Sequence, residues 1–147
     1  MRDYTKIKAW KLADDLTVAV YEQTRSFPRE ELYGLTSQLR RAAYSVPANI
    51  AEGSGRDSKR EYLHHLYIAR GSSAEAKYFI HLARRLGFLS DAEGERLREH
   101  AQTVFACMHG LIQAVEKEAG KLPRIAAVAT SLVVVAMMRI LPKVSGL

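Results

Sequence analysis

A single cysteine, Cys107, is present in the 147 residues of the chain. An intrachain disulfide and a cysteine-based zinc site both need more thiols, so both are excluded. Glycine and proline are also scarce, at nine and four residues, which is too few for a disordered chain. Residues 1–11 carry several charges and no apolar run, so we predict no signal peptide. These features together are typical of a cytoplasmic protein, which is the localisation we expect.

Acidic side chains are outnumbered by basic ones, and the formal net charge is +6 at pH 7. An excess of positive charge favours anionic partners such as nucleic acid or acidic lipid. A charged surface that only keeps the protein soluble explains a value of this size equally well. Net charge alone therefore leaves both interpretations open.

No stretch of the first 120 residues alternates apolar and polar residues with a period of two, so we predict no sheet there. Apolar residues instead recur at spacings of three and four, which is the period of an α-helix. Ser58 with Glu61 and Ser90 with Glu93 form capping boxes, and Gly87 is placed to end the third helix. The four predicted helical segments are residues 6–25, 35–53, 58–87 and 90–120.

Short connections between these segments require neighbouring helices to run antiparallel. We therefore predict an all-α fold, an up-down antiparallel four-helix bundle domain over residues 1–120. Gly71 weakens the third helix, and we expect it to allow close approach of a neighbouring helix. The predicted core includes Leu39, Ile50, Leu66, Ile80, Val104 and Leu111.

Residues 121–147 form an apolar C-terminal tail of unknown role. Its central run, residues 125–138, has no charge and lies between Arg124 and Arg139. A membrane-spanning helix needs about 20 apolar residues, so membrane contact is possible but not favoured. Three interpretations stay open: a fifth helix or strand packed on the bundle or in an oligomer, a membrane tail anchor, and a poorly selected extension.

The sequence also lacks the patterns that carry chemistry. Glu61 and His64 have the Glu-x-x-His spacing of di-iron bundles, but the second copy that such sites need is absent. Cys107 lacks a basic partner on its own helix face, because His109 lies two residues away. There is no glycine-rich phosphate motif. We therefore expect no metal, no cofactor and no catalytic residues, and hence no enzyme.

Three blocks of sequence carry a family resemblance. Residues 38–43 (QLRRAA), 45–53 (SVPANIAEG) and 66–75 (LYIARGSSAE) resemble the S23-type bacterial proteins that are encoded by intervening sequences within 23S ribosomal RNA genes. The similarity covers about residues 4–117 and does not extend to the tail. A more distant likeness is to the accessory protein of diversity-generating retroelements, which works with a reverse transcriptase and nucleic acid.

The resemblance implies an up-down four-helix bundle that assembles as a ring-like homo-oligomer, typically a homopentamer. It also implies a ribosomal RNA or reverse transcriptase context, and it carries no catalytic residues over to this chain. Exposed aromatic residues beside the helical seams would suit subunit contacts. The aromatic residues that we expect at such contacts are Tyr44, Tyr67, Tyr78 and Phe105.

Four residues of the family signature, Pro47, Asn49, Glu52 and Gly53, invite a structural interpretation. Pro47 lacks a backbone N–H, so it leaves one carbonyl of its helix without a donor. We predict that the Asn49 side chain bonds a backbone group freed in this way. Glu52 is placed to pair with Arg56 or Lys59.

Basic residues off the apolar seams are the candidate nucleic-acid contacts. They form three groups, one of which lies at the start of the third helix, where free backbone N–H groups also favour anions. Few aromatic residues are expected on the outer faces, so recognition should be directed at the phosphate backbone. The candidates are Arg40, Arg41, Arg56, Lys59, Arg60, Arg84 and Arg85.

These observations favour a non-enzymatic, oligomeric helical-bundle protein that binds RNA, DNA or a nucleic-acid-handling partner through basic surfaces. The alternative is a structural or scaffolding bundle with no role in nucleic-acid binding. The salt dependence of nucleic-acid binding separates the two.

Overall fold

The computed structural model describes residues 2–120 of the chain. All regular structure in this part is helical, and no strand is present in it, so the predicted all-α class is confirmed. Four long helices alternate with short 3-10 turns and loops. The helices are α1 (Lys8–Gln23), α2 (Leu35–Ser54), α3 (Lys59–Arg85) and α4 (Asp91–Gly120), and the 3-10 turns are η1 (Tyr4–Lys6), η2 (Thr24–Ser26) and η3 (Arg29–Glu31).

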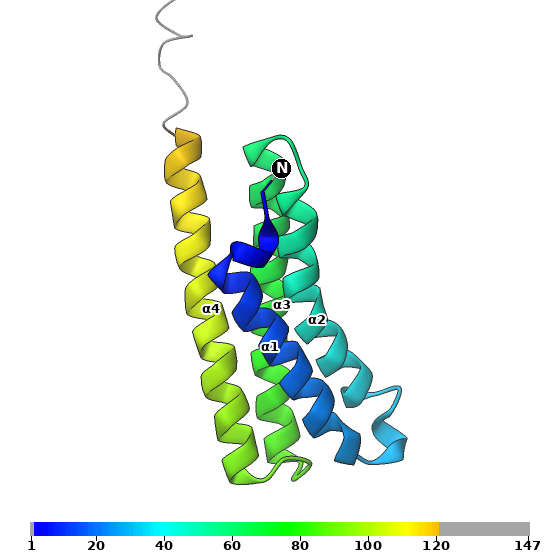
Figure 1. Cartoon of the computed structure of the whole chain (residues 1–147). Helices are drawn as coiled ribbons and strands as arrows, with labels where there is room; N and C mark the ends of the chain where they lie inside the picture. The colour runs from blue at the N-terminus through cyan, green and yellow to red at the C-terminus, as the bar shows by residue number, and fades with distance from the viewer. Residues whose placement is uncertain (1, 121–147) are drawn as a thin grey trace, which may run out of the picture.

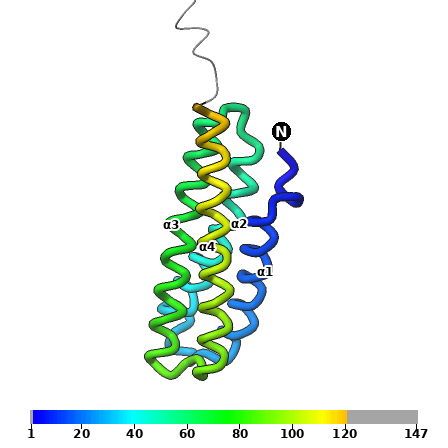
Figure 2. Tube along the Cα trace, turned by 90° about the vertical axis from the view of Figure 1, so that its left-hand side faces the viewer, coloured from blue at the N-terminus to red at the C-terminus, as the bar shows by residue number. Residues whose placement is uncertain are grey.

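The helices form an up-down bundle (Figures 1 and 2). α1 packs against α2 and α4, and α3 packs against the same two helices, so neighbours in the chain are neighbours in space. The N-terminus, the α2–α3 turn and the end of α4 lie at one end of the bundle (Figure 1). The connections α1–α2 and α3–α4 lie at the opposite end, which we call the turn end.

Helix α3 matches its predicted pattern at every core position. Tyr62, Leu66, Ala69, Ser73, Ala76, Ile80 and Ala83 are all buried. The spacing of four and three places these residues on the face of α3 that contacts α2 and α4. The core extends across all four helices, with Leu39 and Ile50 of α2 and Val104 of α4 also fully buried.

Helix α4 departs from the prediction at one position. Ile112 is buried, whereas the predicted core residue Leu111 is only half-buried at the edge of the core. Both residues are aliphatic, and either can follow Met108 at a helical spacing. At this turn of α4 the side of the helix that faces the core carries Ile112, so Ile112 is the buried residue.

The capping residues predicted for α3 and α4 are confirmed. Ser58 caps α3, because its side chain accepts a hydrogen bond from the Glu61 backbone N–H while donating to the Glu61 carboxylate. At the start of α4 the Ser90 hydroxyl likewise accepts from the Glu93 backbone N–H, and both the hydroxyl and the backbone N–H of Ser90 donate to the Glu93 carboxylate. Gly87, just after α3, has φ of +74°, a conformation that glycine adopts without strain.

One expectation about glycine is wrong. Gly71 is exposed, and a side chain there would meet nothing within 4 Å, so no helix approaches it closely. The close approach instead occurs at Gly53 of α2. A Cβ atom at that residue would lie 2.7 Å from the Cβ of His65 and 3.0 Å from the Tyr62 ring.

The predictions for the apolar tail, residues 121–147, lie outside the described residues. Among the helices of residues 2–120, none is long and apolar enough to cross a bilayer.

Candidate nucleic-acid interface

The seven predicted basic residues do not form one surface. Arg56, Lys59 and Arg60 lie at the α2–α3 turn, at the end of the bundle that also holds the N-terminus (Figure 1). The other four lie on α2 and near the end of α3, toward the turn end. The basic group at the α2–α3 turn is therefore separated from the other two basic groups along the length of the bundle.

The cations at the α2–α3 turn are largely engaged within the bundle. The Arg56 guanidinium lies 2.6 Å from the Glu52 carboxylate, which confirms the predicted pair. Lys59 lies 3.5 Å from the Glu118 carboxylate and donates to the Glu118 carbonyl oxygen. Arg60 is exposed and has no ion pair among residues 2–120.

The pair at the end of α3 is also divided. Arg84 contacts the carboxylates of Asp91 and Glu95 at 2.9 and 3.5 Å, so its charge is compensated within the α3–α4 connection. A hydrogen bond from Arg98 lowers the pKa of Glu95, which keeps that carboxylate ionised. Arg85 is exposed and belongs to no ion pair within the described part of the chain.

Arg40 and Arg41 are adjacent in sequence but have different environments. Arg40 is half-buried, its Nε donates to the Thr24 hydroxyl at 2.7 Å, and its guanidinium lies 4.8 Å from the centre of the Tyr21 ring. Arg41 is exposed and contacts only the Gln38 side chain, at 3.3 Å. Arg40 thus connects α2 to α1, whereas Arg41 lies on the outside.

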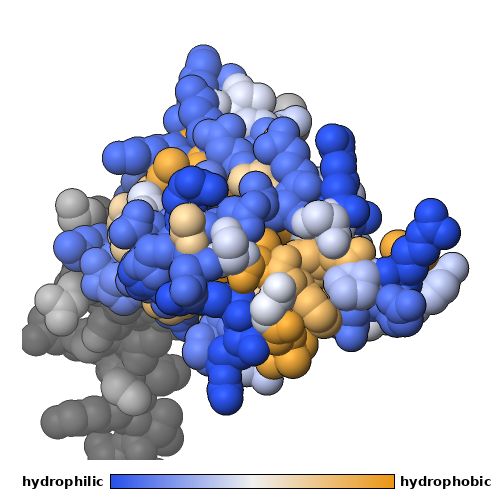
Figure 3. Space-filling view, turned by 90° about the horizontal axis from the view of Figure 1, so that it is seen from below, coloured by the Kyte–Doolittle hydropathy of each residue, from blue (hydrophilic) through white to orange (hydrophobic). Residues whose placement is uncertain are grey.

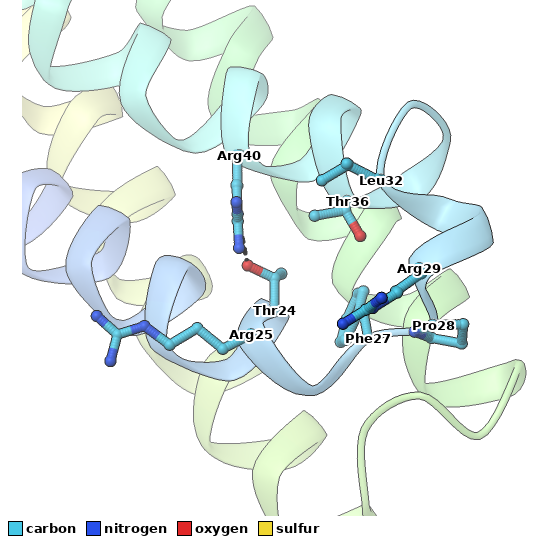
Figure 4. Close-up of a pocket in the computed structure, with 8 residues that line it drawn as sticks. All are labelled: Thr24, Arg25, Phe27, Pro28, Arg29, Leu32, Thr36 and Arg40. Atoms are coloured by element: carbon cyan, nitrogen blue, oxygen red, sulfur yellow. Dashed lines mark hydrogen bonds between the residues drawn. The ribbon is translucent and has the colours of Figure 1, made fainter.

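Arg40 also lines a cavity of about 290 Å³ that the sequence did not reveal. Two further arginines, Arg25 and Arg29, line it from opposite sides of the Phe27–Pro28 turn. We call this cavity the arginine pocket, and Figure 4 shows its lining. Its lining residues are Thr24, Arg25, Phe27, Pro28, Arg29, Leu32, Thr36 and Arg40.

Thr36 is a second threonine in the lining of the arginine pocket. Its side chain is almost fully buried, and its hydroxyl has no hydrogen-bond partner among residues 2–120. Figure 4 shows the hydroxyl oxygen directed to the side of the pocket where Phe27 and Arg29 lie. Buried hydroxyls are nearly always hydrogen-bonded in native proteins, so this position is unusual.

A second hollow of about 380 Å³ adjoins the arginine pocket and shares Leu32, Thr36 and Arg40 with it. Three tyrosines line this hollow, which we call the tyrosine groove. They are Tyr21, Tyr33 and Tyr44, all exposed, and Tyr33 is 90% exposed. The expectation of few outward aromatic residues is therefore wrong on this face, because tyrosines and an arginine lie side by side.

The charge of the bundle itself is smaller than that of the whole chain. Four of the 22 cations, Lys121, Arg124, Arg139 and Lys143, follow residue 120, and all 16 acidic residues precede it. Residues 1–120 thus hold 18 cations and 16 carboxylates, a net charge of +2. Any attraction of the bundle for an anion must come from local grouping of cations.

An apolar patch lies on the turn end of the bundle (Figure 3). Leu32 and Leu86, from the two connections at this end, are each about half exposed, at 49% and 51%. Beside them the Phe27 and Phe88 rings lie 5.6 Å apart and join the α1–α2 connection to the α3–α4 connection. The arginine pocket therefore borders an apolar surface on one side.

The signature residues join α2 to α3. The His65 ring on α3 lies between two of them, with Nδ1 3.3 Å from the side-chain oxygen Oδ1 of Asn49 and Nε2 3.8 Å from the Glu52 carboxylate. Gly53 provides the room for this contact, as described above. Pro47 is buried in the same helix. These residues determine how closely the two helices approach.

Asn49 differs from the prediction in its backbone partner. Its side-chain amide donates to the Ser45 carbonyl at 2.9 Å, four residues back. The carbonyl that Pro47 leaves without a donor is that of Ala43, so Asn49 does not compensate for the proline. It also donates to the Ser45 hydroxyl, which contacts the Ser72 hydroxyl of α3 at 2.9 Å.

The four aromatic residues predicted at subunit contacts divide into two kinds. The Tyr67 hydroxyl hydrogen-bonds Glu116, and the Lys77 ammonium lies 4.7 Å from the centre of the Phe105 ring, so both rings serve α3–α4 contacts. Tyr44 and Tyr78 are exposed, at 46% and 58%, and Tyr67 is also 40% exposed. Cys107 is half-buried, and residues 2–120 contain no cluster of His, Cys, Asp or Glu suited to a metal ion.

The fold and the site thus define the class of protein. It is a four-helix bundle with a groove between α1 and α2 that arginines and tyrosines line. The family of 23S rRNA-intervening sequence proteins matches residues 5–110. The chain belongs to this family.

A solved structure supports the fold. It is a crystal structure of a protein of unknown function from the S23 ribosomal protein family of Bacteroides thetaiotaomicron VPI-5482. The likeness has a TM-score of 0.66 at 18% sequence identity, and covers 71% of this chain and 95% of that one. No match was found among curated proteins. Neither the family description nor that of the solved structure names a catalytic activity.

Proposed function

We propose that this chain is a non-enzymatic, homo-oligomeric bundle protein that binds RNA or DNA through the face formed by α1 and α2. The observation that carries the proposal is the grouping of Arg25, Arg29 and Arg40 there. None of these arginines contacts a carboxylate within residues 2–120, whereas Arg56, Lys59 and Arg84 do. Cations without a partner can neutralise phosphates at little cost.

The tyrosine groove adds a second kind of contact to this face. Exposed aromatic rings provide stacking platforms for bases with little sequence preference. Tyr21, Tyr33 and Tyr44 lie beside Arg40, so one face combines phosphate contacts with stacking. We therefore expect single strands to bind more tightly than duplexes, whose bases are already stacked.

Oligomer formation would repeat this face around a ring. If each of five subunits neutralises one or two phosphates, the assembly makes on the order of five to ten contacts. Binding should then weaken by about a thousand-fold or more between 50 and 200 mM salt. Light scattering of the full chain at micromolar concentration measures the assembly, and a monomer would contradict this part of the proposal.

The direct test is fluorescence anisotropy with single-stranded RNA, single-stranded DNA and duplex DNA across a salt series. The double variant Arg25→Glu/Arg29→Glu should weaken binding to all sequences and flatten the salt slope. The control is Arg96→Glu/Lys117→Glu, which makes the same charge change at exposed positions of α4. Equal losses in both variants would contradict a specific α1–α2 face.

A scaffolding role is the second candidate, and the exposed apolar surface favours it. Tyr78 and Ile68 of α3 are exposed, as is the apolar patch at the turn end, while the net charge of residues 1–120 is only +2. Exposed apolar surface of this kind suits protein partners. An absence of nucleic-acid binding at 50 mM salt with micromolar protein would favour this role.

A further inference from the structure

We infer that the arginine pocket binds the phosphate of a nucleoside 5′-monophosphate, whose nucleoside lies in the tyrosine groove. The nucleotide is either free or the 5′ end of an oligonucleotide, and the chemistry of recognition is the same for both. The inference rests on the proposed function only in using the same face of the bundle. A discrete pocket for one phosphate can exist whether or not long nucleic acids bind.

Arg40 is already positioned to receive an anion. Its Nε is held by the Thr24 hydroxyl at 2.7 Å, and Tyr21 stacks on its guanidinium at 4.8 Å. Its two terminal nitrogens have no hydrogen-bond partner among residues 2–120. Such a fixed guanidinium can donate two parallel hydrogen bonds to one phosphate with little loss of side-chain freedom.

Thr36 supplies a second donor in the same pocket. Its side chain is only 3% exposed, and its hydroxyl has no partner among the described residues. A buried hydroxyl without a partner lowers stability, so the unpaired Thr36 hydroxyl destabilises the ligand-free protein. A phosphate oxygen in the pocket would accept from it.

The remaining polar lining also favours an anion. Arg29 lines the arginine pocket together with Arg40, and no carboxylate lines either cavity. Arg25 is also a lining residue, but its guanidinium extends away from the other labelled side chains (Figure 4). Two acidic residues, Glu30 and Glu31, lie between lining residues in the sequence, and Glu31 accepts a hydrogen bond from the backbone N–H of Leu35. The ligand must therefore bring both negative charge and acceptor oxygens. A phosphomonoester brings close to two charges and three acceptor oxygens.

The apolar lining and the adjoining groove identify the rest of the ligand. Phe27, Pro28 and Leu32 offer apolar surface next to the arginines. The two cavities, of about 290 and 380 Å³, share Leu32, Thr36 and Arg40, so one molecule can occupy both. Their sizes suit a small ligand with a phosphate and an aromatic ring. The tyrosines are suited to stacking on that ring.

Isothermal titration of the full chain with adenosine 5′-monophosphate, inorganic phosphate and adenosine tests the pocket directly. We expect the monophosphate to bind at least about ten-fold more tightly than adenosine, because only it uses the arginines. In anisotropy, the same oligonucleotide should bind more tightly with a 5′-phosphate than with a 5′-hydroxyl. If the monophosphate and adenosine bind alike or not at all, the inference is wrong.

Adjacent arginines provide a matched pair of variants. Arg40→Gln should weaken monophosphate binding about ten-fold or more, whereas Arg41→Gln should change it less than about two-fold. Because Arg40→Gln also removes a contact between α1 and α2, Thr36→Val provides a second test. It should weaken binding while leaving the protein as stable as the wild type or more so, since an unsatisfied hydroxyl is lost. Equal effects of Arg40→Gln and Arg41→Gln would overturn the inference, as would unchanged affinity in Thr36→Val.

The two proposals fail in different ways. Monophosphate binding that depends on Arg40, without salt-sensitive binding of long strands, would refute the proposed function and support the pocket. Binding of long strands that ignores the 5′-phosphate, with no monophosphate binding, would overturn the pocket and support the proposed function.

Discussion

Gly53→Ala is expected to destabilise the bundle, because α2 and α3 approach each other closely at this residue. A Cβ atom there would lie 2.7 Å from the Cβ of His65 and 3.0 Å from the Tyr62 ring. The His65 Cβ is bound directly to the backbone, so rotating a side chain cannot relieve the contact and the helices must move apart. Overpacking of this kind costs about 1–3 kcal/mol.

Gly71→Ala is the matched control for this substitution. It makes the same chemical change in α3, where an added Cβ meets nothing within 4 Å. Alanine favours helix over glycine, so this variant should gain about 0.5–1 kcal/mol. The difference between the two variants in unfolding free energy should therefore be at least about 1 kcal/mol.

Urea unfolding followed by circular dichroism measures both free energies, and an unchanged m-value shows that the unfolded states are comparable. Variants that agree within about 0.5 kcal/mol, the usual range for surface substitutions, would refute the argument. The close approach of α2 and α3 would then not depend on the missing side chain at Gly53.

Three further predictions concern the core, the helix caps and the tail. Ile50→Asp should cost several kcal/mol or abolish folding, because it buries a charge; a native circular dichroism spectrum with cooperative unfolding would contradict this. Hydrogen bonds from Ser90 lower the pKa of Glu93, so the stability that the ionised carboxylate contributes is present above about pH 4.3 and lost as the pH falls through the lower, folded-state pKa. Ser90→Ala should therefore reduce the loss of unfolding free energy on acidification, and an unchanged pH profile would argue against it. A chain ending at Lys121 should fold into the same bundle but associate less with protein or membrane, as sedimentation and vesicle binding would measure; an unfolded chain would show that the tail belongs to the core.

The predictability of the fold follows from its local character. In α3 the spacing of four and three continues over seven positions, so the buried face could be predicted residue by residue, although apolar residues such as Leu63 and Phe79 lie beside it. In α4 two aliphatic residues, Leu111 and Ile112, are adjacent. A spacing of four followed by three has the same average period as a spacing of three followed by four. Periodicity therefore cannot decide which of the two residues is buried.

The candidate site was less predictable because it depends on contacts between helices. Arg40 and Arg41 are adjacent in the sequence, but only Arg40 contacts Thr24 and Tyr21 of the neighbouring segments, so Arg40 is half-buried and Arg41 is exposed. Arg25 and Arg29 lie at and beyond the end of the predicted segment 6–25, where helical periodicity assigns no face, so neither was predicted. Two arginines four residues apart around a proline turn were the available signal.

Thr36 and the tyrosines illustrate the same limit. A threonine in the first turn of a helix is common, and nothing in the sequence shows that its hydroxyl is buried without a partner. Tyr21, Tyr33 and Tyr44 come from α1, the loop before α2, and α2 itself, so they meet only in the folded chain. Side chains that belong to one helix face were predictable, and side chains gathered from several segments were not.

The alternation of helix directions also has a practical consequence for surface attachment. The N-terminus lies at the end of the bundle opposite the α1–α2 connection (Figure 1). The 27 residues of α3 run from one end to the other, a length of about 40 Å. A fluorophore or a biotin fixed to the N-terminus would therefore stand well away from the arginine pocket. Protein molecules immobilised on a surface through this label would share one orientation, with their turn ends facing outward. The arginine pocket would then be open to ligands in solution.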